Sequence, residues 1–170
     1  PEVREIYDYL GEDLKKISFE GSLEEISKTE NLQPIMIAFQ LSALEILKNK
    51  LPSVDATCGL SLGEYSAVAL AGIVSRKKAL DLVRKRGELM GEASGLIKSK
   101  MLALLKVTEE EARNLLAQRP ELEGKVYIAN INSSKQIVVS GEEAGIDELE
   151  IFLKDQGKVV KPLVVSGAFH

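Results

Sequence analysis

The first hundred residues carry apolar side chains at helical spacing, interrupted by short polar breaks. The four-residue spacing from Ile6 to Leu14 predicts an amphipathic helix in the opening stretch. Ser22 and Glu25 form a Ser-x-x-Glu capping box that starts a further helix. Apolar residues then cover most of the circumference of a helix that opens at Gln33-Pro34 and ends near residue 48. We expect this third helix to be largely buried.

Strand and turn signals follow before the helical pattern resumes. The run 54–59 is a candidate strand that leads into a glycine-containing turn at 59–63. Helical patterns continue over 67–71 and from about 76 to 93, and Ser75 is placed to cap the second of them. This order predicts a strand, a tight turn and a helix in succession.

From Met101 the chain alternates strands and helices in a compact order. The expected strands are 101–107, 125–131, 136–140 and 159–165, and the expected helices begin after Thr108 and span about 143–155. The order βαββαβ is the ferredoxin-like pattern. A change of layer is therefore expected near residues 98–101.

The composition of the chain excludes several classes of function but does not identify one. The 170 residues carry 22 basic and 26 acidic side chains, and the net charge of -4 has the wrong sign for a general nucleic-acid binder. The sequence contains no apolar run of about 18 residues and no secretory signal, so we expect a cytoplasmic protein without a membrane span. Cys58 and His170 are the only residues of their types, which excludes an ordinary zinc site and predicts no metal.

The most specific chemical signal is Gly59-Leu60-Ser61-Leu62-Gly63, placed between a candidate strand and a helix. This is the context of a nucleophile elbow, in which the serine lies on a strained turn and the flanking glycines permit close approach. The backbone N–H of Leu62 would then face an oxyanion. The alternative is that Ser61 caps the helix and the glycines only allow a tight turn.

A nucleophilic serine needs a base, and His170 is the one histidine in the sequence. It follows the last predicted strand, where sites in α/β sheets gather, although a lone histidine is by default a solvated side chain. Asp155 lies between Ser61 and His170 in the order that hydrolases use, but it ends a charged helix, so we do not assign it a role.

Arg86 interrupts the apolar face formed by Ala79, Val83, Gly87 and Met90. A buried guanidinium is costly unless an anion pairs with it, so Arg86 either forms a structural ion pair or receives an anionic ligand. Met90 is expected to pack in the core, one helical turn from Arg86.

Taken in order, these motifs resemble those of the malonyl-CoA:acyl carrier protein transacylases, which are related to the acyltransferase domains of fatty-acid and polyketide synthases. The resemblance covers nearly the whole chain. The matching segments are Gln33-Pro34, residues 59–66, 86–90, 130–133 and 136–141, and Val165-Ser166-Gly167-Ala168-Phe169-His170.

The resemblance implies a fold and a domain division. The fold is α/β, with a serine-bearing, hydrolase-like α/β subdomain and an inserted ferredoxin-like βαββαβ subdomain. The large subdomain would comprise residues 1–100 plus 167–170, and the small one residues 101–166.

The resemblance also implies an activity. Ser61 would take malonyl from malonyl-CoA as an ester and pass it to the phosphopantetheine thiol of acyl carrier protein, in fatty-acid biosynthesis, with His170 as base and then acid. The arginine that pairs with the malonyl carboxylate matches Arg86. Further positions near the substrate match Met90, Gln33, Asn130 and Asn132. No cofactor is implied beyond the coenzyme A thioester and the partner's phosphopantetheine, and no nucleic acid or membrane is an expected partner.

The sequence departs from the family in identifiable places. Leu60 stands where the family commonly has histidine, and Ser134-Lys135 stands where Pro-Gly is common. The family's glycine-rich first loop and its final strand and helices lie outside the matched region. The chain therefore resembles an internal segment of such an enzyme, lacking both ends.

Two other classes of function stay open. A serine esterase or thioesterase shares the elbow but sends the acyl group to water, and has no need of Arg86 in its acyl pocket. A non-catalytic ferredoxin-like interaction module would use neither Ser61 nor His170. Acyl carrier proteins are acidic, so a basic docking patch is a further hypothesis, with the candidates Arg76, Lys77, Lys78, Lys98 and Lys100.

Overall fold

The computed structural model describes residues 2–50, 53–165 and 167–170, which fall into two compact units, Pro1–Gly91 and Glu92–His170. The division lies within the last turns of the helix Arg76–Ser94, nine residues before the predicted boundary at 100/101. It also groups residues 167–170 with the second unit, whereas the sequence predicted that they belong with the first.

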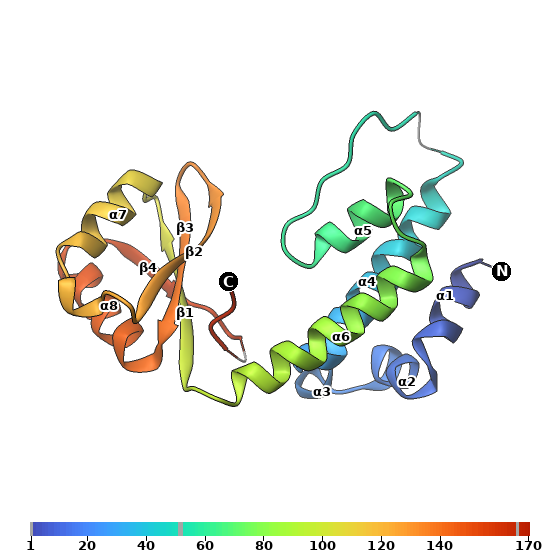
Figure 1. Cartoon of the computed structure of the whole chain (residues 1–170), viewed down its shortest axis with the longest axis horizontal. Helices are drawn as coiled ribbons and strands as arrows, with labels where there is room; N and C mark the ends of the chain where they lie inside the picture. The colour runs from blue at the N-terminus through green and yellow to red at the C-terminus, as the bar shows by residue number, and fades with distance from the viewer. Residues whose placement is uncertain (1, 51–52, 166) are drawn as a thin grey trace. The chain divides into compact units, whose positions relative to one another are not determined.

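Helices form the first unit (Figure 1). Their bounds are α1 Glu2–Leu10, α2 Glu12–Glu20, α3 Leu23–Ser27, α4 Thr29–Leu47, α5 Gly63–Leu70 and α6 Arg76–Ser94. A core of apolar side chains holds α1, α4 and α6 together; its buried members are Ile6, Leu10, Ile35, Ile37, Ala38, Leu41, Leu80 and Val83. Within the described parts of the chain, no helix is both long and apolar enough to cross a membrane.

Local signals predicted several of these helix ends. The capping box is present: Ser22 Oγ accepts from the Glu25 N–H at 3.2 Å, and Glu25 Oε2 accepts from the Ser22 N–H at 2.9 Å. The predicted start of α4 at Gln33-Pro34 is wrong by one turn, because the helix already begins at Thr29. Pro34 lies inside the helix, where its ring nitrogen has no hydrogen to donate to the carbonyl of Glu30.

The strand predicted over 54–59 does not form. Residues 53–59 have no regular secondary structure and are exposed, and Val54 is 53% exposed. A strand needs a neighbour to pair its backbone N–H and C=O groups, and the described residues of the first unit contain no other strand. Cys58, which lies in this segment, is exposed.

The second unit contains the predicted order of strands and helices (Figure 1). Its elements are β1 Ser99–Leu105, α7 Glu109–Ala117, the short 3-10 helix η1 Pro120–Leu122, β2 Val126–Ser133, β3 Gln136–Glu142, α8 Glu143–Asp155 and β4 Val159–Pro162. The strand order is β2-β3-β1-β4 and every neighbouring pair is antiparallel. β4 is three residues shorter than predicted; it ends at Pro162, which has no N–H for the ladder.

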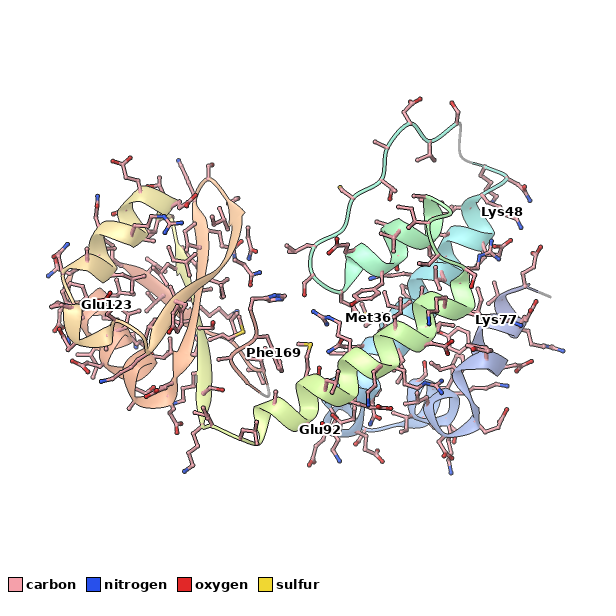
Figure 2. The ribbon with its side chains drawn as sticks, in the orientation of Figure 1. Met36, Lys48, Lys77, Glu92, Glu123 and Phe169 are labelled. Atoms are coloured by element: carbon pink, nitrogen blue, oxygen red, sulfur yellow. The ribbon has the colours of Figure 1, made fainter. Side chains whose placement is uncertain are left out.

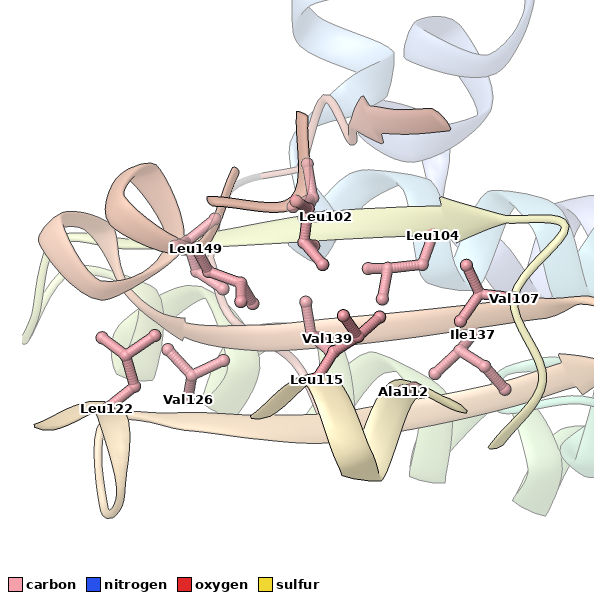
Figure 3. Packing of buried hydrophobic residues seen from close by; sticks show 12 residues of the cluster. Leu102, Leu104, Val107, Ala112, Leu115, Leu122, Val126, Ile137, Val139 and Leu149 are labelled. Carbon is pink, nitrogen blue, oxygen red and sulfur yellow. The ribbon is translucent and has the colours of Figure 1, made fainter. Parts of the chain in front are cut away.

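The alternation of side chains along β1 and β3 gives the sheet two different faces. On one face Leu102 and Val139 are paired, and both point toward α7 and α8 in a core without polar side chains (Figure 3). On the opposite face Met101, Ala103 and Val138 form a smaller buried cluster. Phe169 packs against this second cluster, so the last residues of the chain are attached to the sheet of the second unit.

Candidate active site

The turn around Ser61 has two local features of a nucleophile elbow, although the strand expected before it does not form. Ser61 has a φ of 50°, in the left-handed region that residues other than glycine rarely adopt. A Cβ added at Gly59 would lie 2.2 Å from the carbonyl carbon and oxygen of Gly63, so only glycine fits at position 59. A Cβ added at Gly63 would meet no atom within 4 Å among the described residues. The close approach predicted for both glycines is therefore present at Gly59 alone.

Leu62 connects the turn to α5. Its backbone is helical, with φ -57° and ψ -39°, and its side chain packs against the helical core. Its N–H therefore belongs to the first turn of α5, where helix amides lack intrahelical acceptors and favour negative charge. This is the location that the sequence predicted for an oxyanion donor.

Arg86 of α6 lies next to Ser61. Its Nη2 donates to Ser61 Oγ at 2.9 Å, and its Nη1 donates to Gln33 Oε1. The guanidinium carbon also lies 6.0 Å from the ring centre of Tyr65. No carboxylate among the described residues forms an ion pair with Arg86, so the partners described for this half-buried cation are two neutral oxygens and the Tyr65 ring. Of the two interpretations left open by the sequence, the geometry disfavours the structural ion pair.

Gln33 extends this cluster toward the start of α4. It is 4% exposed, and its Nε2 donates to Thr29 Oγ1 at 2.7 Å and to Met90 Sδ at 3.2 Å. Four residues predicted separately, on α4, on α6 and at the turn before α5, therefore meet in the first unit: Gln33, Ser61, Arg86 and Met90. Met90 is half-buried and contributes a hydrogen-bond acceptor as well as packing.

His170 belongs to the second unit, where its backbone is held from two strands. The hydroxyl of Ser140, a residue of β3 that is 2% exposed, donates to the His170 carbonyl at 2.9 Å. The N–H of Ala168 donates to Ser99 Oγ on β1 at 2.8 Å. Phe169, labelled in Figure 2, packs against the smaller buried cluster of this sheet. His170 has a φ of 72°, so both predicted catalytic residues have left-handed backbones.

Asn130 and Asn132 lie on β2 of the second unit. Asn130 is half-buried and pairs with Val138 of β3, next to an irregularity in the ladder, whereas Asn132 is exposed. Neither belongs to the cluster of the first unit. Their proximity to a substrate stays a prediction.

Several candidate docking residues already have partners within their own units. Arg76 pairs with the buried carboxylate of Glu45, and Lys77 lies 3.5 Å from Glu5. Lys100 pairs with Asp147 at 2.8 Å and Glu143 at 3.0 Å, and the hydrogen bonds to these carboxylates raise its pKa. These ion pairs weaken the hypothesis of a basic docking patch.

Sequence reasoning missed two polar residues that contact predicted site residues. Thr29 contacts Gln33, and Ser140 contacts His170. The position of Thr29 four residues before Gln33 places both on one helix face, which was an available signal. Ser140 pairs with its partner across 30 residues, and no local pattern indicates such a contact.

Comparison with known proteins gives a consistent set of relatives. Residues 5–170 match the family model described as acyl transferase domain. The malonyl CoA-acyl carrier protein transacylase of Bacillus subtilis (strain 168) is 38% identical over 175 residues, which cover 100% of this chain and 55% of that protein. The chain thus spans about half the length of the curated relatives it matches.

Solved structures give the same result. The malonyl CoA-acyl carrier protein transacylase from Clostridium perfringens Atcc 13124 has a TM-score of 0.89 at 34% identity, covering 99% of this chain and 54% of that one. A malonyl-transacylase solved in complex with a type II PKS acyl-carrier protein has a TM-score of 0.86 at 31% identity, covering 98% and 54%.

Proposed function

Because the chain belongs to the acyl transferase domain family, we propose that it transfers a malonyl group from malonyl-CoA to the phosphopantetheine thiol of acyl carrier protein, through an ester on Ser61. The observation that carries this proposal is the bond from Arg86 Nη2 to Ser61 Oγ. It places a cation without a carboxylate partner beside the proposed nucleophile, where the free carboxylate of a malonyl ester would lie. The names of the similar proteins support the choice of donor and acceptor.

In the first half-reaction, Ser61 Oγ attacks the thioester carbonyl while His170 accepts the hydroxyl proton. The negative charge on the carbonyl oxygen is stabilised by the Leu62 N–H at the start of α5. The carbon–sulfur bond then breaks, and His170 returns the proton to the coenzyme A thiolate. In the second half-reaction the carrier-protein thiol gives its proton to His170 and attacks the malonyl ester. Its sulfur takes the acyl group, and the proton returns to Ser61 as the ester bond breaks.

The role of Arg86 in this proposal is to choose the acyl group. A malonyl carboxylate can accept from both terminal nitrogens of the guanidinium, whereas an acetyl group leaves the cation with its neutral partners. Gln33 and Met90 would shape the acyl pocket of the first unit. The family resemblance also implies that Asn130 and Asn132 act near the substrate. Acyl carrier protein and malonyl-CoA are the proposed partners.

We also infer the finer fold assignment. The order βαββαβ and the antiparallel strand order β2-β3-β1-β4 support a ferredoxin-like small subdomain over residues 101–166. The left-handed Ser61 and the tight approach at Gly59 support a hydrolase-like large subdomain around the serine turn.

Intact-mass analysis of the full-length protein after brief incubation with malonyl-CoA tests the proposal. We expect one malonyl adduct, absent from Ser61→Ala and scarce with acetyl-CoA. Ser66→Ala is the matched control, because Ser66 lies on α5 and donates to Gln40 rather than to the cluster, and it should retain the adduct. Release of free coenzyme A without transfer would indicate a thioesterase. If neither an adduct nor free coenzyme A is detected, the result would favour a non-catalytic binding module.

A further inference from the structure

The hydrogen bonds around Arg86 extend through Gln33 to Thr29, the first residue of α4. Thr29 is 7% exposed and Gln33 is 4% exposed, so both side chains are largely withdrawn from water. Thr29 Oγ1 lies 2.7 Å from Gln33 Nε2, on the side of the amide opposite Arg86. A continuous chain of polar contacts therefore joins the start of α4 to the hydroxyl of Ser61.

The two ends of the Gln33 amide are not equivalent in this environment. A guanidinium has only donors, so the amide must present its oxygen to Arg86. If the amide were rotated by half a turn, its NH₂ group would face the Arg86 donors and no hydrogen bond could form. Arg86, which can only donate, and Met90 Sδ, which accepts from Nε2, select this orientation. The Thr29 hydroxyl, which accepts from Nε2 at 2.7 Å, anchors the amide in it.

The backbone around Thr29 is held by close packing of α4 against α6. A Cβ added at Gly87 would lie 3.0 Å from the Thr29 carbonyl oxygen and 3.1 Å from the Cα of Glu30. One added at Gly91 would lie 3.7 Å from Thr29 Cγ2. The two glycines are one turn apart on α6 and let this helix approach the start of α4 closely. The Thr29 hydroxyl is therefore fixed relative to the helix that carries Arg86.

From these contacts we propose that Thr29 is a positioning residue that holds the Gln33 amide with its oxygen toward Arg86 and thereby sets the preference for acyl groups ending in a carboxylate. The proposal rests on the proposed function for its substrate. Thr29 acts through Gln33 and does not itself touch the acyl group. Loss of the hydroxyl removes this anchor, so the Gln33 amide and the Arg86 guanidinium that it contacts are held less firmly. Binding of the carboxylate is then weakened, and a neutral acyl group is unaffected.

The test compares Thr29→Val and Thr29→Ser in the full-length protein. Valine keeps the shape of threonine without the hydroxyl, and serine keeps the hydroxyl without the methyl group. We expect Thr29→Val to raise KM for malonyl-CoA about five- to tenfold, the loss of one buried hydrogen bond, with little change in kcat or in acetyl-CoA loading. Thr29→Ser should retain the malonyl preference. An unchanged malonyl-to-acetyl ratio in Thr29→Val, or an equal loss in both variants, would overturn the proposal.

A second measurement does not depend on catalysis. In protein labelled with ¹⁵N at glutamine, the side-chain amide signal of Gln33, assigned by its loss in Gln33→Ala, should shift in Thr29→Val and stay in place in Thr29→Ser. An unchanged signal in Thr29→Val would overturn the positioning role directly. If the wild type forms no malonyl adduct, the proposed function and the selectivity it confers fail, while the amide signal still decides whether Thr29 orients Gln33.

Discussion

Replacing Arg86 with alanine should remove the preference for malonyl-CoA while leaving Ser61 in place. Arg86 Nη2 donates to Ser61 Oγ at 2.9 Å, and Nη1 donates to Gln33. In the proposed complex the malonyl carboxylate accepts hydrogen bonds from the Arg86 guanidinium. The variant would therefore bury one end of the malonyl group without a counter-charge.

The size of the effect follows from the burial of the pair. Truncating one partner of a buried, hydrogen-bonded charge pair costs about 2–5 kcal/mol. Arg86 is half-buried, so we take the lower part of that range, about 2–3 kcal/mol. At 1.4 kcal/mol for each factor of ten, kcat/KM for malonyl-CoA should fall about 30- to 140-fold. Loading from acetyl-CoA has no carboxylate to lose and should change little.

The assay is the rate of acyl-enzyme formation with each donor, followed by intact mass in the full-length protein. Arg84→Ala is the matched control, since Arg84 lies two residues earlier on α6 and donates to the Leu10 carbonyl. It should lower the thermal stability without changing the ratio of malonyl to acetyl loading. A thermal melt of both variants separates loss of fold from loss of selectivity.

Two results would refute this reasoning. The first is an Arg86→Ala protein that loads malonyl at the wild-type rate, which would show that the carboxylate lies elsewhere. The second is an equal loss of malonyl and acetyl loading in a folded variant, which would mean that Arg86 acts on Ser61 itself and does not choose the acyl group.

Three further outcomes are expected. Gly59→Ala places a Cβ 2.2 Å from backbone atoms, so it should displace the serine turn and slow acyl-enzyme formation about 100-fold in the intact-mass assay. A wild-type rate would contradict the close approach at Gly59. Ser140→Ala removes the donor to the His170 carbonyl and should lower kcat about three- to tenfold at unchanged KM; a change in KM alone would argue against positioning of the base. The Ser22 backbone N–H lowers the pKa of Glu25 from its ordinary 4.5, so the stability from this bond is present above about pH 4.5 and is lost as the pH falls through the lowered pKa; an NMR midpoint at or above 4.5 would contradict this.

Much of the second unit could be predicted because its signals are local. β1 and β3 carry short continuous apolar runs, and Thr108 caps α7 by accepting from the Glu111 N–H at 3.2 Å. Each of these features is encoded within a few residues. The end of β4 at Pro162 is a local signal as well, although the prediction extended the strand past it.

Part of the predicted site also rests on local signals. The elbow motif and the interruption of an apolar helix face by Arg86 are both visible within one turn or one helix. The strand at 54–59 failed because strand character is satisfied only by a paired neighbour, and composition does not reveal whether one is present. The bond from Arg84 to the Leu10 carbonyl could not be predicted, because its partner is the end of a helix that lies 74 residues away in sequence.

By itself, the sequence determined the period of each element, most of the capping positions and the residue types available for acyl transfer, since these depend on neighbours within about one helical turn. Only the tertiary structure decided that Thr29, Gln33, Arg86 and Ser61 share one hydrogen-bonded chain, because three helices must pack before their side chains meet. It also decided that His170 is held by the sheet of the second unit, through a bond to Ser140. Core packing sets the distances between segments that are remote in sequence, and the pattern of residues along the chain does not indicate these distances.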